Sequence, residues 1–267
     1  MSSNSEHDAW SAGKNYEHYM GRWSRQIAER FVEWLGPPEN SDWLEVGCGT
    51  GALTKTVLAQ CSPCSILAID QSAEFVSHAK SAINDGRIRF ETADAQQLPA
   101  GDGTVDVAAS ALVLNFIPDK AKALREMQRT LRPGGILAFY VWDYPGGGVG
   151  FIDAFWKAAA ELDSRAAELD ESRRFPFCTR DGLVAICRNA GLRSPEIAPI
   201  EIKTEFTDFE AFWHPFTLGA GPAPGYCMSL TGSDREKLKS RLAETLGTDR
   251  AIVLPARAWG IKCQNSS

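Results

Sequence analysis

Short apolar runs alternate with segments of helical periodicity through the first half of the chain. The apolar runs are residues 43–46, 66–70, 88–93, 105–113 and 136–142. Between them, apolar residues recur at spacings of three and four, as they do on the buried face of an amphipathic helix. Strands that alternate with helices form a parallel sheet covered by helices on both faces. The pattern therefore predicts an α/β fold for residues 42–143.

The remaining segments extend this pattern at both ends. An amphipathic helix is expected at 15–35, because its aromatic residues fall on one face. Further helices are expected at 151–162 and 180–190, and further strands at 196–206 and 251–261. The predicted organisation is a disordered tail at 1–14, a cofactor-binding core at 15–143, a lid insertion at 144–178, and completion of the sheet at 179–267 with a helical insertion at 207–247.

The two insertions are interpreted as a lid over an acceptor pocket. The consecutive glycines at 146–148 suit a hinge, since a few residues there can absorb large changes of φ and ψ. The alternative is that both insertions only decorate the core or form an oligomer contact. The sequence does not predict the oligomeric state.

Composition excludes several classes of partner. The 267 residues carry a net charge of −6 and no basic block, which argues against a nucleic-acid partner. No apolar run approaches 20 residues, and the polar start lacks a secretory signal, so neither a membrane span nor export is expected. The seven cysteines are scattered, which favours free thiols in a cytoplasmic protein. The Cys61–Cys64 pair lacks a second pair at zinc spacing, and no metal site is expected.

A glycine-rich turn follows the first apolar run. The run reads Leu-Glu-Val-Gly-Cys-Gly-Thr-Gly over residues 44–51. Glycine permits the positive φ of a sharp turn and lets a ligand approach the main chain. Dinucleotide-binding proteins use G-x-G-x-x-G/A, which Gly47, Gly49 and Ala52 satisfy loosely. The alternative is G-x-G-x-G with an acid two positions upstream, here Glu45, and the turn alone leaves both open.

Carboxylates end the next two predicted strands. Asp70 lies 19 residues after Gly51, where an acid can accept hydrogen bonds from two ribose hydroxyls. Its alternative role is to cap the helix that begins near Ser72. Asp94 opens the run Asp-Ala-Gln-Gln-Leu-Pro, and its alternative role is that of a turn residue. Carboxyl ends of parallel strands meet at one edge, so these acids, the glycine turn and Ser110 are expected together.

These motifs resemble the class I S-adenosylmethionine (SAM)-dependent methyltransferases. The resemblance covers residues 15–143 and rests on E-x-G-x-G-x-G, on D-A-x-x-L-P and on L-R-P-G-G after the fourth strand. The run at 19–24 is similar to the ubiquinone-biosynthesis-like branch, also called methyltransferase type 11. The resemblance implies a doubly wound Rossmann-like sheet of seven strands with the last strand antiparallel, to which this chain adds the helical lid insertions. It also implies SAM as cofactor and a small-molecule acceptor.

The resemblance also assigns roles to residues. The guanidinium of Arg22 is expected to face the cofactor carboxylate, Asp94 to accept from the adenine amino group, and the Ala95 amide to meet the ring. The cofactor-binding residues are expected to be Arg22, Glu45, Gly47, Cys48, Gly49, Gly51, Asp70, Gln71, Asp94, Ala95, Gln96 and Ser110. The substrate-facing residues are expected to be Tyr19, Asn115, Trp142, Asp143, Tyr144 and His214.

A general base is not evident from the sequence. Asn115 stands where family members often carry histidine, and an amide cannot take a proton. Asp143 and His214 are alternative bases, and catalysis by positioning alone is a third option. The aromatic and apolar residues of the insertions favour a hydrophobic or aromatic acceptor, methylated at oxygen, nitrogen or carbon. The competing functions are an NAD(P)-dependent oxidoreductase and a non-catalytic SAM-binding module.

Overall fold

The computed structural model describes residues 14–265, so the tail expected at 1–14 lies almost entirely outside the described residues. The described chain divides into two compact units. The sheet unit comprises residues 24–142, 177–200 and 258–265. The helical unit comprises residues 14–23, 143–176 and 201–257. Each unit is thus assembled from three separate stretches of chain.

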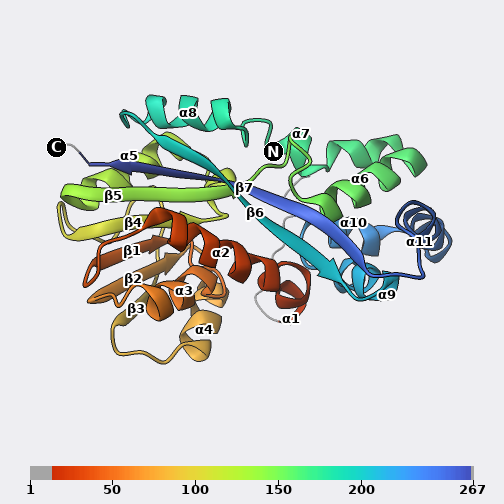
Figure 1. The fold of residues 1–267 in the computed structure, drawn as a ribbon, viewed down its shortest axis with the longest axis horizontal. Coiled ribbons are helices and arrows are strands. Elements are labelled where there is room, and N and C mark those ends of the chain that lie inside the picture. Colours follow the sequence, from red (N-terminus) through yellow and green to blue (C-terminus); the bar gives the residue numbers. More distant parts are fainter. Residues whose placement is uncertain (1–13, 266–267) are drawn as a thin grey trace. The chain divides into compact units, whose positions relative to one another are not determined.

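One seven-stranded sheet runs in the order β3-β2-β1-β4-β5-β7-β6 (Figure 1). Its strands are β1 (Asp42–Val46), β2 (Ser65–Asp70), β3 (Ile88–Thr92), β4 (Val105–Ala111), β5 (Leu131–Trp142), β6 (Glu196–Phe206) and β7 (Ile252–Gln264). The first five strands pair in parallel, whereas β7 runs antiparallel to β5. This arrangement confirms the predicted seven-stranded fold with an antiparallel last strand.

The sheet register aligns the strand ends that carry the candidate site. Val46 pairs with Ile69 on one side and with Ser110 on the other, so β1, β2 and β4 end side by side. The β1 residues from Trp43 to Val46 are all buried. Such a continuous apolar strand is typical of a parallel sheet with both faces covered.

Helices cover both faces of the sheet unit. They are α2 (Arg22–Leu35), α3 (Ala52–Gln60), α4 (Ala73–Ala82), α5 (Lys120–Thr130) and α8 (Arg180–Asn189). In Figure 1, α5 and α8 lie on one face of the sheet, and α2, α3 and α4 lie on the other. Because α2 begins at Arg22, its first two residues belong to the helical unit. Two-sided coverage is the doubly wound arrangement expected from the alternating pattern.

The boundary between α5 and β5 differs from the prediction. The fifth apolar run was placed at 136–142, but β5 begins at Leu131, so residues 132–135 also belong to the strand. The Gly134 amide donates to the Asn265 carbonyl at 2.8 Å, and the Asn265 amide donates to Gly135 at 2.7 Å. The expectation is wrong because the partner of this segment, β7, lies some 130 positions away and leaves no local signal.

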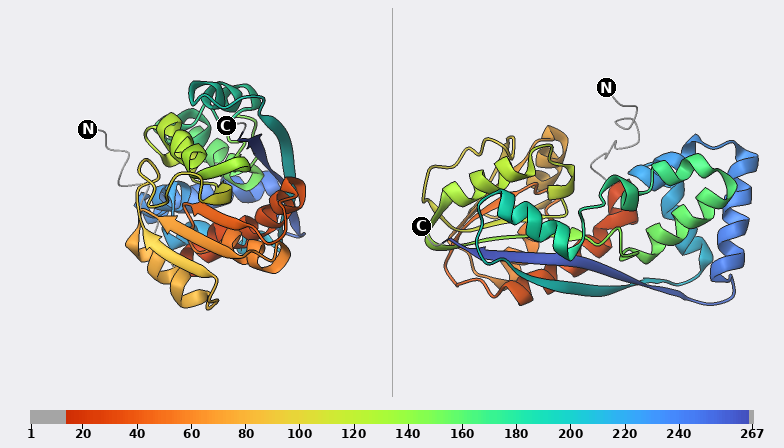
Figure 2. Two further views of the ribbon diagram at one scale, coloured as in Figure 1. Left: turned by 90° about the vertical axis from the view of Figure 1, so that its left-hand side faces the viewer. Right: turned by 90° about the horizontal axis from the view of Figure 1, so that it is seen from above.

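The helical unit is built mainly from short helices (Figure 2). These are α1 (Lys14–Tyr16), a π-helical turn (Glu17–Gly21), α6 (Gly150–Leu162), α7 (Glu171–Arg174), α9 (Phe209–Trp213), α10 (Pro222–Ser229) and α11 (Gly232–Leu246), with 3₁₀ turns at Ser164–Glu168 and His214–Leu218. The helix expected at 15–35 is present without a break, but its turn at Glu17–Gly21 is π-helical. The π turn adds a residue to the turn and changes the phase of the helix before α2.

An aromatic core holds the helical unit together. Phe155 on α6 stacks on Phe216 with ring centroids 4.5 Å apart and planes 14° apart. Tyr19 packs edge-on against the Phe216 ring at 5.6 Å between centroids, and the Phe151 ring lies tilted to it at 6.3 Å. These four side chains are at most 2% exposed. The aromatic residues that suggested a lid over an acceptor thus form a packed core.

Candidate active site

The glycine turn links β1 to α3 through three glycines with positive φ. Their φ values are +78° at Gly47, +51° at Gly49 and +83° at Gly51. The amides of Gly47 and Cys48 both donate to the Ile69 carbonyl at 2.8 Å. The turn is therefore fastened to the end of β2, and its conformation requires residues without a Cβ.

The first two glycines serve different purposes. A Cβ built on Gly47 would lie 2.5 Å from a methyl carbon of Val113, so this position is closed by packing. A Cβ built on Gly49 would meet no atom within 4 Å. The main chain at Gly49 therefore borders open space, and a ligand could approach it closely.

Asp70 ends β2 with its carboxylate held by main-chain donors. The Gly49 amide donates to Oδ2 at 3.0 Å, and the Ser72 amide donates to Oδ1 at 2.9 Å. Burial raises the pKa of Asp70, and these two hydrogen bonds lower it. The cap of α4 is Ser72, whose hydroxyl accepts from the Phe75 amide. The structure thus assigns the capping role to Ser72 and joins Asp70 to the glycine turn.

Glu45 is a buried acid, and only one of its two carboxyl oxygens accepts a hydrogen bond within residues 14–265. It is 2% exposed, and its Oε2 accepts from the Thr54 hydroxyl at 2.5 Å. Within residues 14–265, its Oε1 has no hydrogen-bond partner. Burial raises the pKa of Glu45 to about 8, an effect that its hydrogen bond to Thr54 only partly offsets. The side chain is therefore neutral at pH 7 in this structure and could gain a cationic partner.

The loop after β3 holds Asp94 in a local turn. Its Oδ1 accepts from the Gln96 amide at 2.8 Å, and this bond lowers the pKa of Asp94. The Gln96 Oε1 accepts in turn from the Asp119 amide at 3.2 Å, which ties the loop to the start of α5. Asp94 is exposed, and Ala95 is half-buried. Asp94 therefore does stabilise the turn, and its carboxylate is exposed to solvent.

The end of β4 carries two buried polar groups without partners in the described chain. Ser110 is 1% exposed and Asn115 is 4% exposed, and neither the Ser110 Oγ nor the Asn115 Nδ2 has a hydrogen-bond partner. Between them, Leu112 has φ +59°, a left-handed conformation that is strained for a side chain of this size. Strained backbone beside unpaired polar groups is typical of functional sites.

Other predicted residues of the sheet unit contribute less. Cys48 is buried and its thiol pKa is raised by burial, so it is a poor nucleophile. Gln71 is exposed beside Asp70. Trp142 ends β5 and is 2% exposed. Across residues 14–265, no three His, Cys, Asp or Glu side chains are grouped to hold a metal ion.

The predicted residues of the helical unit occupy different surroundings. The Arg22 guanidinium lies 4.1 Å from the Trp23 ring and 4.7 Å from the Phe206 ring. Tyr19 is 1% exposed in the aromatic core, and Tyr144 packs on Phe175. Asp143 and His214 were candidate bases, and they differ sharply in burial.

Asp143 is 2% exposed, and each of its oxygens accepts a hydrogen bond. Its Oδ2 accepts from Arg257 Nε at 2.7 Å, and its Oδ1 accepts from the Gly146 amide at 3.1 Å. His214 is exposed, and its ring lies 6.5 Å from that of His18. The geometry therefore gives Asp143 a structural role at the glycine triplet and leaves the His214 ring exposed on the helical unit.

Three residues of interest were missed by sequence reasoning. Thr54 supplies the hydrogen bond to Glu45, Leu112 carries the strained φ, and Glu171 is an acid buried in the helical unit. Glu171 Oε2 accepts from the Trp156 indole at 2.5 Å, and burial raises its pKa to about 7. A spacing of nine residues after Glu45 could have suggested Thr54, but nothing local marks the other two.

Comparison with known proteins identifies the family. Residues 44–139 match the family model of the methyltransferase domain. Together with the motifs, this match indicates that residues 44–139 form the domain of a class I SAM-dependent methyltransferase. No helix among residues 14–265 is long and apolar enough to cross a membrane.

Individual relatives extend beyond this domain. Human thiol S-methyltransferase TMT1A is 32% identical over 147 residues, which are 53% of this chain and 58% of that protein. Malonyl-[acyl-carrier protein] O-methyltransferase of Acetivibrio thermocellus is 26% identical over 208 residues, 75% of this chain and 69% of that protein. The chain thus spans about three-fifths of the human relative.

A solved structure from Bacillus halodurans C-125 shares the fold. It superposes with a TM-score of 0.60 at 16% identity, over 90% of this chain and 99% of that one. Likeness at this level of identity shows the fold and says nothing of the acceptor. The domain is therefore established, and the reaction of the whole chain is a matter for proposal.

Proposed function

We propose that this protein transfers a methyl group from SAM to a small-molecule acceptor. The observation that carries the proposal is the fixed carboxylate of Asp70 beside the open main chain at Gly49. Both lie at the carboxyl ends of parallel strands, where ligands of doubly wound sheets bind. The membership of residues 44–139 in the methyltransferase family supports the same cofactor.

The residues present fit a nucleoside at Asp70. An ionised carboxylate offers about four acceptor sites, and the amides of Gly49 and Ser72 use one on each oxygen. Both oxygens therefore retain capacity for the two ribose hydroxyls. Because the donors that hold Asp70 belong to the main chain, its position is fixed before a ligand arrives.

The residues also fit the amino-acid part of the cofactor. The main chain at Gly49 is open, and the nearby turn is anchored to β2. Glu45 Oε1 is a buried acceptor without a partner in residues 14–265, and an ammonium group is a donor that would satisfy it. A cation there would also stabilise the ionised form of Glu45 and so lower its raised pKa. Arg22 belongs to the helical unit, and its role toward the carboxylate of the cofactor stays an expectation from the family resemblance.

The cofactor would supply an electrophilic methyl group on a sulfonium, and the chain would supply position and exclusion of water. We assign no general base. Asn115 can orient an acceptor but cannot remove its proton, and both oxygens of Asp143 are already bonded. We propose a small-molecule acceptor methylated at oxygen, nitrogen or carbon, and we do not narrow it to aromatic molecules, because the aromatic residues that favoured them pack on one another.

Calorimetry with SAM, S-adenosylhomocysteine and NAD(P) tests the cofactor. We expect binding of the first two, and we expect Asp70→Asn to weaken it by about 10- to 100-fold, since hydrogen bonds to a charged group contribute about 1.5–3 kcal/mol. Asp102→Asn, at an exposed carboxylate in the same unit, is the control and should leave affinity unchanged. Tight NAD(P) binding without SAM binding would overturn the proposal in favour of an oxidoreductase.

Gly49→Ala tests the open main chain with a closely matched control. Gly36 also has positive φ, at +59°, and a Cβ there would likewise meet nothing within 4 Å. Alanine should cost similar stability at both positions, whereas only Gly49→Ala should lose SAM affinity. Equal affinities for the two variants would contradict the assignment. A protein that binds SAM yet methylates nothing in a broad acceptor library would support the non-catalytic module instead.

A further inference from the structure

A cavity lies in the sheet unit, at the opposite end of the strands from the glycine turn. Its volume is about 320 Å³, at the small end of the range for ligand pockets, about 300–1,000 Å³. It is bordered by the start of β5, the end of β7, the last turn of α5 and the turn after α8. Because β5 begins at Leu131, which pairs with Val105 at the start of β4, the cavity lies at the amino edge of the parallel strands. The residues proposed to hold the cofactor lie at the carboxyl edge, so the two sites are separate.

Apolar side chains form the floor of this cavity. Leu137 on β5 and Cys263 on β7 are paired across the two strands, so their side chains project from the same face of the sheet. Leu192, from the turn after α8, also lines the cavity. All three residues are at most 5% exposed. The floor therefore offers an apolar surface to the hydrocarbon part of a ligand.

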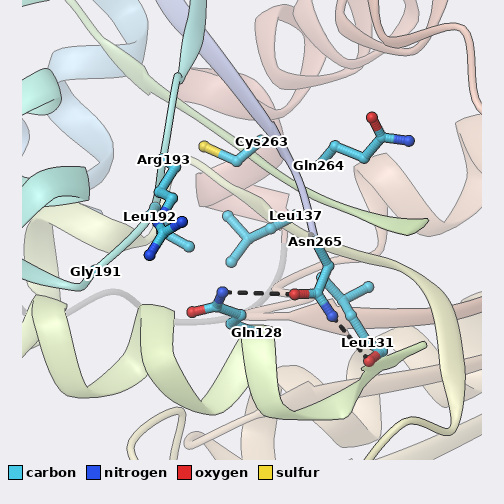
Figure 3. Close-up of a pocket in the computed structure, with 9 residues that line it drawn as sticks. All are labelled: Gln128, Leu131, Leu137, Gly191, Leu192, Arg193, Cys263, Gln264 and Asn265. Carbon is cyan, nitrogen blue, oxygen red and sulfur yellow. Dashed lines mark hydrogen bonds between the residues drawn. The ribbon is translucent and has the colours of Figure 1, made fainter. Parts of the chain in front are cut away.

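The polar side chains of the cavity carry one positive charge. Arg193, Gln128 and Gln264 line it, and no described residue that lines it is acidic. Arg193 is exposed, and its guanidinium has no hydrogen bond or ion pair within residues 14–265. Figure 3 shows the Arg193 and Gln128 side chains directed toward each other, with Leu137 and Cys263 beside them. A chain of net charge −6 thus places a cation without a counter-ion beside an apolar floor.

The turn that carries Arg193 is held by main-chain hydrogen bonds. The Leu192 amide donates to the Cys187 carbonyl at 3.0 Å, and the Gly191 amide donates to the Arg188 carbonyl at 2.9 Å. These two amides are therefore not available to an anion. Phosphate sites typically use several main-chain amides, whereas a carboxylate fits the fork of one guanidinium. The cavity therefore favours a carboxylate over a phosphate.

Asn265 fixes another wall of the cavity. It is 6% exposed, and its side-chain amide donates to the carbonyls of Leu131 at 3.1 Å and Arg132 at 3.2 Å. Its Oδ1 accepts from Gln128 Nε2 at 3.5 Å, a bond drawn as a dashed line in Figure 3. The polar wall is thus positioned by the folded chain itself, before any ligand enters.

We propose that this cavity binds a small carboxylate that carries an apolar body. The carboxylate pairs with the Arg193 guanidinium through two parallel hydrogen bonds, the geometry that guanidinium and carboxylate groups prefer. The apolar body lies on Leu137, Leu192 and Cys263. This ligand is a different molecule from SAM, and its binding does not depend on the function proposed above.

Hexanoate is the probe for this site, and ¹H–¹⁵N correlation spectra of the full chain report its binding. We expect millimolar hexanoate to shift the Arg193 Nε–H signal and the side-chain amide signals of Gln128 and Gln264. Hexylammonium has the same body and the opposite charge, and it should shift none of them. Propionate should bind at least about 10-fold more weakly, since each buried methylene contributes about fourfold. Hexanoate that shifts none of these signals, or hexylammonium that shifts them equally, would overturn the proposal.

Arg193→Gln tests the charge with a matched control. Affinity for hexanoate should fall about 10-fold or more, because hydrogen bonds to charged groups are stronger than those between neutral groups. Arg188→Gln removes the same charge from an exposed position on α8 that does not line the cavity, and it should leave the affinity unchanged. Equal losses in the two variants would show a general effect of charge and would contradict the site.

Saturating S-adenosylhomocysteine tests whether the site is separate. The hexanoate shifts should persist in its presence, since the cavity and the glycine turn lie at opposite edges of the sheet. Loss of the hexanoate shifts when S-adenosylhomocysteine binds would place the carboxylate in the cofactor site and overturn the proposal.

Discussion

Glu45 and Asp143 are both 2% exposed, and the two units use them in opposite ways. In the sheet unit, Glu45 accepts one bond from Thr54 and keeps an oxygen without a partner in the described chain. In the helical unit, both Asp143 oxygens are bonded, one to Arg257 and one to the Gly146 amide. A buried carboxyl oxygen without a hydrogen bond costs stability that a ligand can restore, whereas the ion pair between Asp143 and Arg257 stabilises the fold.

The same contrast extends to the neighbours of these acids. Several groups that could bind a ligand lie at the carboxyl edge of the sheet. They are the Asp70 carboxylate, the Ser110 hydroxyl and the open main chain at Gly49. The helical unit instead concentrates aromatic rings, such as the stacked pair Phe155 and Phe216. We infer that the first region is organised to bind and the second to pack. The following variants test that division in decreasing order of expected effect.

Phe155→Ala should destabilise the helical unit by about 3–5 kcal/mol, because it leaves a cavity among fully buried rings. Hydrogen exchange measured peptide by peptide should show lost protection within residues 143–176 and 201–257. Leu162→Ala on the same helix is the control, since that side chain is 48% exposed and should change little. Unchanged exchange in Phe155→Ala would show that the aromatic cluster does not hold the unit together.

Gly47→Ala should cost the sheet unit about 3 kcal/mol. Alanine at φ +78° is strained by about 1–2 kcal/mol, and its Cβ would collide with Val113. Gly36→Ala should show only the strain, since nothing lies near its Cβ. Urea unfolding compares the two variants. Equal midpoints would mean that the turn accommodates the new Cβ beside Val113 without further loss of stability.

Glu45 should make stability depend on pH. Its folded pKa is about 8 and its ordinary value is 4.5, so between these values the folded state holds a proton that the unfolded state has released. The free energy of unfolding should therefore fall as pH rises through this window, by up to about 1.4 kcal/mol per pH unit. Glu45→Gln should remove that slope in urea titrations at pH 5 to 8.

Glu171 provides the matching control in the helical unit. The pKa of Glu171 in the folded protein is about 7, so its contribution to the pH dependence of the unfolding free energy should end near pH 7. This contribution should persist in the Glu45→Gln variant. Saturating SAM should flatten the Glu45 slope, because a cation would stabilise the ionised carboxylate, and it should leave the Glu171 slope unchanged. A slope indifferent to both Glu45→Gln and SAM would refute the proposed pairing.

The sequence allowed the alternation of strands and helices and the glycine turn to be predicted because both have local signals. Gly47, Asp70 and Asp94 follow apolar runs directly, and strand ends converge by topology alone. Strand β6 was predicted at its observed bounds, Glu196–Phe206. The early start of β5 was missed because it depends on pairing with residues near 265. Contacts between distant positions leave no periodicity to detect.

The side-chain environments were less predictable for the same reason. The exposed ring of His214 and the saturated carboxylate of Asp143 follow from packing between segments far apart in the chain. Glu171 gives no sequence signal, since its burial depends on Trp156 on another helix. The aromatic residues of the insertions were correctly recognised as apolar, but their spacing could not distinguish a ligand pocket from a core.

Strand β7 follows every other strand in chain order, yet it lies between β5 and β6. During synthesis, β5 is therefore complete before β7 has been made. Until then, the main-chain amides and carbonyls along the long free edge of β5 have no strand to pair with. Such an edge invites pairing with neighbouring nascent chains. Loss of residues 252–264 would leave that edge open permanently, so a chain interrupted there should aggregate even though every residue of the glycine turn is present.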